Sequence, residues 1–187
     1  MIMGNVSERR KQPPQVGVSV VILALGPVPQ SDVGAGAASS GMGSTLWMPL
    51  VKRVRQPFLG QWALPGGGLR ADHSLEQSAY AALESTTSLH PKYLEQLYTF
   101  GDPARSHGGL PMVSIVYWAL VGEADGRIDF AGGDNVKWFP VNHLPELAFD
   151  HRTIVEYAMN RLRGKIESPD IAPRSVSYTH LTLPTIR

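Results

Sequence analysis

Three arginines around a glycine-rich turn are the side chains best suited to bind an anionic group. Arg53 and Arg55 alternate at the end of an expected strand, and Arg70 follows the turn Pro65-Gly66-Gly67-Gly68. A guanidinium group is planar and carries parallel N–H donors that match the oxygens of a phosphate. We therefore predict that Arg53, Arg55 and Arg70 bind a diphosphate, with a solvated surface position as the alternative for each.

A second set of candidate residues lies where the strand expected over residues 93–100 runs into a loop. Phe100 ends this strand, and Asp102 and Arg105 follow it. An aromatic ring stacks on adenine, a carboxylate accepts hydrogen bonds from ribose hydroxyls, and a guanidinium donates to phosphate. We predict ligand contacts from all three side chains, although a strand aromatic such as Phe100 is more often part of the core.

The helix expected after the glycine turn lacks the carboxylates of a magnesium site. Magnesium prefers carboxylate and water oxygens in octahedral geometry, and side chains at i, i+3 and i+4 of one helix share a face. One such set in this helix is Ala82, Ser85 and Thr86, and none of the three carries a carboxylate. Glu84 points to another side of the helix, because it lies only two residues after position 82. The sequence predicts no catalytic residue, no metal ligand and no cofactor.

The glycine turn and the helix after it resemble a known motif. Residues 61–68 resemble the opening of the Nudix box, G-x5-E-x7-R-E-U-x-E-E-x-G-U, in which U is aliphatic. Counted from Gly67, the two aliphatic positions are kept by Leu83 and Leu89. The acidic, arginine and glycine positions are occupied instead by His73, Ala81, Ala82, Ser85, Thr86 and Ser88.

The resemblance covers roughly residues 16–167, and over this range the sequence is similar to one subgroup of the family. The matching segments are residues 57–62, 93–103, 138–141, 147–151 and 161–165. This subgroup comprises the Nudix-related transcriptional regulators of NAD metabolism and related ADP-ribose pyrophosphatases. The resemblance implies a Nudix fold, of α/β (α+β) class, with a mixed β-sheet sandwiched between helices.

For function, the resemblance implies a sensor of ADP-ribose or a related NAD metabolite, with a degraded catalytic box. It also implies a homodimer, and DNA binding only through a C-terminal winged helix that this sequence lacks. One alternative is an active Nudix hydrolase that cleaves a nucleoside diphosphate derivative with Mg²⁺ held by displaced acids such as Glu76, Glu84 or Asp102. Another is a decayed gene whose fold persists without function.

The elements expected to position these residues follow from hydrophobic periodicity and turn signals. Ser74 and Gln77 form a capping-box pair at the start of the first helix, and Asp150 is expected to cap the second. Strands are expected over residues 15–25, 46–54, 93–100, 112–121 and 135–139, and residues 56–68 are expected to form a rigid loop.

The chain divides into three parts. Residues 1–14 are expected to form a mobile tail, and residues 15–166 a Nudix-like domain with a flexible loop over 26–45. Residues 167–187 are expected to be a truncated linker and an artefactual tail, because the stretch from Val176 resembles a translated sequencing adaptor.

Composition excludes several classes of protein. Seventeen Lys and Arg against sixteen Asp and Glu leave a net charge of +1 on 187 residues, without a whole-chain footprint for nucleic acid or an anionic membrane. The absence of Cys excludes disulfides, thiolate metal sites and cysteine nucleophiles. We expect a cytoplasmic protein that does not bind membranes.

A secretory signal is the alternative for the N-terminal region. Basic residues 9–11, the apolar run Val16–Leu25 and small residues 35–37 have the order of such a signal. Pro13 and Pro14 separate the charges from the apolar run, and that run alternates at first as a strand does. The strand is therefore favoured.

Overall fold

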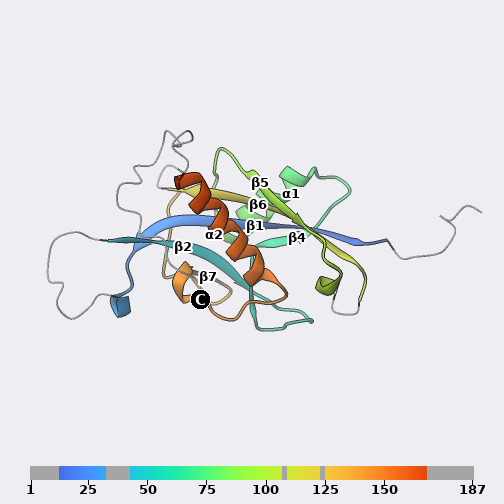
Figure 1. Ribbon diagram of the computed structural model, residues 1–187, viewed down its shortest axis with the longest axis horizontal. Coiled ribbons are helices and arrows are strands. Elements are labelled where there is room, and N and C mark those ends of the chain that lie inside the picture. The colour runs from blue at the N-terminus through green and yellow to red at the C-terminus, as the bar shows by residue number, and fades with distance from the viewer. Residues whose placement is uncertain (1–12, 33–42, 107–108, 123–124, 168–187) are drawn as a thin grey trace, which may run out of the picture.

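The computed structural model of the chain (Figure 1) describes residues 13–32, 43–106, 109–122 and 125–167. Most of the predicted N-terminal tail, 1–14, lies outside these residues. So do residues 33–42 of the predicted loop and nearly all of the predicted linker and adaptor-like tail, 167–187.

The described residues form one seven-stranded sheet and two long helices. Five strands lie in the order β3-β2-β1-β6-β5, while β4 pairs with β1 and β7 pairs with β2. The elements are β1 Gln15–Pro27, β2 Ser44–Lys52, β3 Trp62–Ala63, β4 Gly66–Gly68, α1 Leu75–Thr87, β5 Glu95–Phe100, β6 Met112–Val121, β7 Val136–Pro140 and α2 His151–Glu167.

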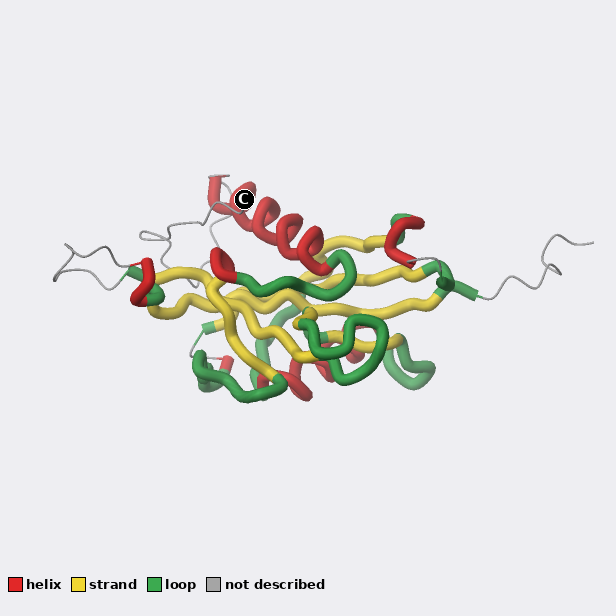
Figure 2. Tube along the Cα trace, turned by 90° about the horizontal axis from the view of Figure 1, so that it is seen from below, coloured by secondary structure: helices red, strands yellow, loops and turns green. Residues whose placement is uncertain are grey.

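The two helices cover opposite faces of the sheet (Figure 2). Side chains alternate between the faces of a strand. In β1, Val20 and Ile22 therefore pack in the cluster that contains the buried residues of α1, whereas Val21 and Leu23 pack in the cluster that contains those of α2. Because β1 pairs parallel with β6 and antiparallel with β2, the sheet is mixed. The predicted α/β (α+β) architecture, a mixed sheet between helices, is confirmed.

The predicted pairing of the first two strands is confirmed, but the loop between them is shorter than residues 26–45. Gly26 pairs with Thr45 and Pro27 with Ser44, so the ladder continues into the stretch expected to be a loop. The indole nitrogen of Trp47 donates a 3.0 Å hydrogen bond to the Pro27 carbonyl oxygen. A Cβ at position 26 would lie 2.6 Å from the Trp47 ring, so glycine here makes room for an aromatic neighbour.

The glycine turn was predicted to be part of a loop, but it contains strand β4. Gly66 pairs with Ser19 of β1. A Cβ on Gly66 would lie 2.5 Å from the carbonyl oxygen of Val18, so only glycine allows the two backbones to approach this closely. The turn is thereby fixed against β1, and α1 begins seven residues later at a set position.

Helix α1 begins and ends as its sequence requires. The predicted capping box is confirmed, because the Gln77 N–H donates to Ser74 Oγ at 3.1 Å and the Ser74 N–H donates to Gln77 Oε1 at 2.8 Å. The helix ends at Ser88 with φ of 56°, a left-handed conformation. Glycine adopts this conformation most easily, which explains why the Nudix pattern has glycine there.

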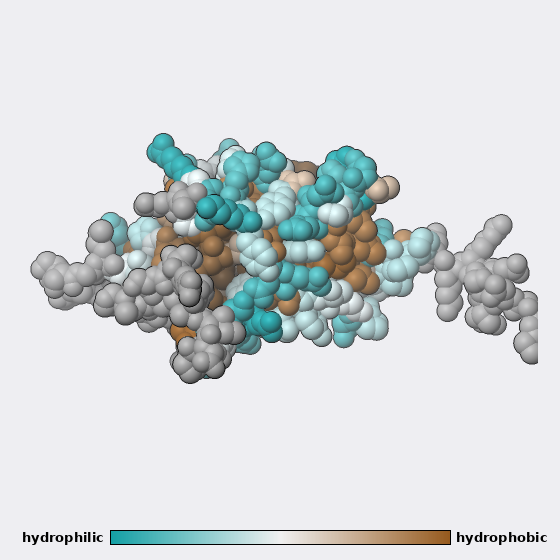
Figure 3. Space-filling view, turned by 90° about the horizontal axis from the view of Figure 1, so that it is seen from above, coloured by the Kyte–Doolittle hydropathy of each residue, from teal (hydrophilic) through white to brown (hydrophobic). Residues whose placement is uncertain are grey.

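The surface combines polar and apolar regions. Figure 3 shows apolar surface beside polar side chains on the face seen from above. Within the part of the chain that the structure describes, no helix is long and apolar enough to cross a membrane.

Candidate functional site

A cleft of about 950 Å³ opens beside the N-terminal half of β1, the end of β2 and the glycine turn. Its volume is within the range of small-molecule sites, about 300–1,000 Å³. Among the cleft's lining residues are four cations and no Asp or Glu: Lys52, Arg53, Arg55 and Arg105. This charge pattern suits an anionic ligand.

Arg53 is held partly desolvated at the edge of the cleft. Its Nε donates a 2.8 Å hydrogen bond to the Pro57 carbonyl oxygen, and its guanidinium lies 4.6 Å from the centre of the Phe149 ring. Burial lowers the pKa of Arg53 from its usual value. The terminal nitrogens make no hydrogen bond within the described residues, so they are left to bind a ligand. Arg55, also on the cleft, is exposed.

His151 lies buried in the same cleft. Its Nδ1 accepts a 3.0 Å hydrogen bond from the Leu64 N–H. Burial lowers the pKa of His151 to about 4, although the neighbouring Asp150 carboxylate opposes this shift. The ring is therefore neutral at pH 7.

The depressed pKa makes folding stability depend on pH. The unfolded chain takes up a proton at His151 near pH 6.5, whereas the folded protein does so near 4. The stability that His151 contributes above pH 6.5 is lost progressively as the pH falls to 4, by about 3 kcal/mol in total. We expect His151→Asn to flatten the denaturant-derived stability curve over this window. Protonation of His151 near pH 6.5 in an NMR titration of the folded protein would contradict this.

A second cleft, of about 540 Å³, adjoins the first. The candidate residues Phe100, Asp102 and Arg105 all line it. Arg105 and Phe149 line both clefts, so the two spaces meet at these side chains. Aromatic and carboxylate groups thus lie next to the cationic cleft.

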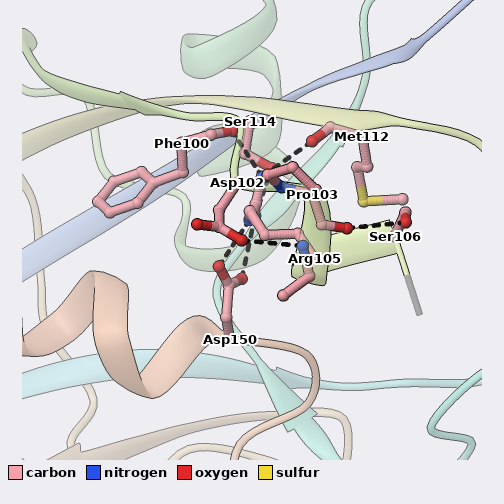
Figure 4. A network of polar contacts seen from close by, with 9 residues as sticks. Phe100, Asp102, Pro103, Arg105, Ser106, Met112, Ser114 and Asp150 are labelled. Atoms are coloured by element: carbon pink, nitrogen blue, oxygen red, sulfur yellow. Dashed lines mark hydrogen bonds and ion pairs between the residues drawn. The ribbon is translucent and has the colours of Figure 1, made fainter. Parts of the chain in front are cut away.

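The Arg105 side chain forms a buried network (Figure 4). Nε and Nη2 donate to the two Asp150 carboxylate oxygens at 2.6 and 3.0 Å, and Nη2 also donates to Ser114 Oγ at 2.9 Å. Nη1 donates to the carbonyl oxygens of Phe100 and Met112 at 2.7 and 3.4 Å. These bonds use all five donors of the guanidinium. Direct binding of phosphate by Arg105, which we predicted, would require one of them to break.

The network also changes the interpretation of Asp150. The sequence predicts that its side chain caps the second helix, whereas its carboxylate accepts from Arg105 instead. The 3₁₀ turn Pro103–Ser106 brings Arg105 towards the start of α2. The ion pair therefore ties the loop after β5 to the beginning of α2.

Arg70, unlike the other candidate residues, lines neither of the two clefts. Its Nε and Nη2 donate to the two carboxylate oxygens of Asp72 at 3.0 and 2.9 Å, and both side chains are exposed. The pair raises the pKa of Arg70 and lowers the pKa of Asp72.

The residues at the carboxylate positions of α1 do not fit a magnesium ion. Ser85 Oγ and Thr86 Oγ1 donate to the carbonyl oxygen of Ala82 at 3.0 and 2.9 Å, so both hydroxyls turn back onto their own helix. Neither carries charge, and Ala82 has no ligand atom. Over the described ranges, no group of three or more His, Cys, Asp or Glu could hold a metal ion.

Sequence reasoning did not nominate three residues of the clefts: Lys52, Phe149 and His151. The centre of the Phe149 ring lies 4.6 Å from the Arg53 guanidinium and 5.5 Å from the centre of the His151 ring. The local signal is a single aromatic followed by Asp-His at a helix start, which is too common to indicate a site. Phe149 and His151 reach the cleft through links to residues far away in the sequence: the Ala148 N–H donates to the Trp62 carbonyl oxygen and the Leu64 N–H donates to His151 Nδ1.

The comparisons with known proteins identify the family. Residues 34–158 match the NUDIX domain. The chain is 33% identical over 118 residues to an ADP-ribose pyrophosphatase of Methanocaldococcus jannaschii, covering 62% of this chain and 67% of that protein. It is 30% identical over 120 residues to the ADPR responsive transcriptional repressor NtrR of Acinetobacter baylyi, covering 62% of this chain and 48% of the repressor.

A solved structure agrees with these relatives. The NUDIX domain of Shewanella oneidensis NrtR, crystallised with ADP ribose, superposes with a TM-score of 0.61 at 32% identity, covering 84% of this chain and 94% of that domain. The matched region therefore corresponds to nearly the whole NrtR domain but to about half of the Acinetobacter repressor.

Proposed function

This chain belongs to the Nudix domain family, and we propose that it binds ADP-ribose or a related NAD metabolite without hydrolysing it. In this proposal it is the sensor part of a transcriptional regulator. The observation that carries the proposal is the pair of adjoining clefts, one with cationic residues and no carboxylate, the other with aromatic and acidic residues.

The chemistry of the two clefts suits the parts of ADP-ribose. Its diphosphate is anionic, and Arg53 has terminal N–H groups left to bind it at the edge of the first cleft. In the second cleft, the Phe100 ring would contact adenine and the Asp102 carboxylate would accept from ribose hydroxyls. The Phe100 ring also packs against Tyr157 and the core, so only part of it faces the cleft. The likeness to an NrtR domain crystallised with ADP ribose supports the same choice of ligand.

An active Nudix hydrolase using Mg²⁺ is the second candidate function. The 33% identity to an ADP-ribose pyrophosphatase favours it. It would need acids at positions other than those of the box to hold the metal ion. Two candidates, Glu76 and Glu84, are exposed on α1. The third, Asp102, lies in the second cleft and accepts from the Ala104 N–H at 2.8 Å. Three separate carboxylates supply no common metal site, so we favour binding alone.

Replacing the arginines of the first cleft tests the ligand proposal. We expect Arg53→Ala and Arg55→Ala to weaken ADP-ribose binding roughly tenfold or more in calorimetry, because charge-assisted hydrogen bonds contribute about 1.5–3 kcal/mol.

Arg70→Ala provides the matched control, since Arg70 is exposed, lies outside both clefts and already pairs with Asp72. An affinity equal to wild type is expected for it. Unchanged affinity in both the Arg53 and Arg55 variants would contradict a diphosphate site in this cleft.

The regulatory part of the proposal concerns the whole protein. As a regulator it would act in the cytoplasm as a homodimer and bind DNA through a winged-helix domain encoded after the Nudix domain. The likeness to a transcriptional repressor supports this role. The uninterrupted genomic sequence tests it, because the regulator role requires such a domain in the full gene.

A further inference from the structure

The feature of the first cleft that the proposed function leaves unused is the second ring nitrogen of His151. The side chain is buried, with 8% of the residue's surface exposed, and the residue lines the cleft. Because Nδ1 accepts the Leu64 N–H, the neutral ring carries its proton on Nε2. His151 thus presents a hydrogen-bond donor.

Among the described residues, no group accepts a hydrogen bond from this donor. In the part of the chain that the structure describes, two side-chain polar atoms are fully enclosed and lack a partner: His73 Nδ1 and Trp118 Nε1. His151 Nε2 is not one of them, so it is not fully enclosed. Nε2 therefore reaches open space, and the space that His151 lines is the cleft.

The surroundings hold the ring in place beside the cations. Nδ1 accepts from the backbone N–H of Leu64 at 3.0 Å, and the ring centre lies 5.5 Å from that of Phe149. The Phe149 ring also contacts the guanidinium of Arg53, at 4.6 Å. His151 and Arg53 are thus arranged about one aromatic ring, and both line the same cleft.

A fixed donor without a partner in a cationic cleft calls for an acceptor on the ligand. We infer that His151 is a ligand-binding residue whose Nε2–H donates a hydrogen bond to a diphosphate oxygen of the nucleotide bound beside Arg53. The inference deepens the proposed function and rests on it for the identity of the nucleotide. In the ligand-free protein the ring is neutral, because burial and the Arg105 and Arg53 cations disfavour its charged form more than Asp150 favours it.

A pair of variants separates the donor from the fold. In His151→Asn, the side-chain oxygen can still accept from the Leu64 N–H, but the donor at the Nε2 position is gone. In His151→Gln, the longer amide restores a donor at that position. We expect His151→Asn to bind ADP-ribose and ADP roughly ten- to a hundredfold more weakly, and His151→Gln to recover part of the loss.

The calorimetric outcomes distinguish a failure of the proposed function from a failure of the inference about His151. If wild-type protein does not bind ADP-ribose, the proposed function fails. If wild type binds and His151→Asn binds equally well, the inference about His151 fails alone. A loss confined to ADP-ribose and absent with ADP would also overturn the diphosphate contact.

A measurement on the wild-type chain avoids dependence on folded variants. In protein with ¹⁵N-labelled histidine, the His151 ring is expected to show a protonated Nε2 and an unprotonated Nδ1. Addition of ADP-ribose, or of inorganic pyrophosphate as a probe of the diphosphate alone, is expected to shift the Nε2–H resonance. A proton on Nδ1, or an Nε2–H resonance that neither probe moves, would overturn the inference.

Discussion

Incubated with ADP-ribose and excess magnesium or manganese, the purified protein is expected to release AMP no faster than a buffer blank. Hydrolysis in this family requires the diphosphate charge to be neutralised by divalent metal, and the α1 positions that would hold the metal are Ala82, Ser85 and Thr86. Both hydroxyls are bonded to the Ala82 carbonyl oxygen. These three positions therefore supply no carboxylate to a metal ion.

The assay is chromatographic separation of AMP from ADP-ribose, with an active Nudix hydrolase run in parallel as the positive control. Turnover near the ordinary enzyme range of about 1–10³ s⁻¹ would contradict the expected result. In that event the variants Glu76→Gln, Glu84→Gln and Asp102→Asn would identify the acid responsible.

Removing the Arg105 side chain is expected to have the largest effect on stability. Arg105→Ala would leave the Asp150 carboxylate partly buried without its partner, and would leave Ser114 Oγ and two carbonyl oxygens without a donor. Breaking a buried ion pair from one side costs about 3–5 kcal/mol. We expect a loss of that size in urea unfolding.

Two further variants serve as comparisons for the Arg105→Ala protein. Arg70→Ala also breaks an arginine–aspartate pair, but an exposed one, and should leave the unfolding midpoint unchanged. Replacing both partners, Arg105→Met with Asp150→Leu, should be less destabilising than Arg105→Ala because no buried charge is left alone. An Arg105→Ala protein as stable as wild type would contradict the structural role of this network.

The parts of the fold that the sequence predicts well depend on neighbours along the chain. The capping box joins Ser74 to Gln77, three residues apart, and its residue types alone indicate the helix start. The alternation at the start of β1 likewise indicates a strand, and the continuous apolar run that follows indicates that both of its faces are covered. Strand β4 was missed because Gly66–Gly68 carries no hydrophobic pattern, and its pairing depends on β1, far away in the sequence.

The same distinction applies to the candidate site. Arg53 and Arg55 were nominated because two arginines alternate at the end of an expected strand, and both line the first cleft, although β2 itself ends at Lys52. For Arg105 the residue type indicated a phosphate ligand, but its partner Asp150 lies 45 residues along the chain, and only the fold shows that its donors are used. His151 could not be nominated from sequence, because its role depends on the Leu64 backbone 87 residues away.

The central claim is that the clefts bind ADP-ribose without a metal ion, and titration calorimetry in the presence of EDTA tests it most directly. The account predicts saturable binding of one ADP-ribose per chain in EDTA, with the same affinity when magnesium replaces the chelator and with the nucleotide recovered intact. Binding that appears only with magnesium, or no binding in either buffer, would contradict it.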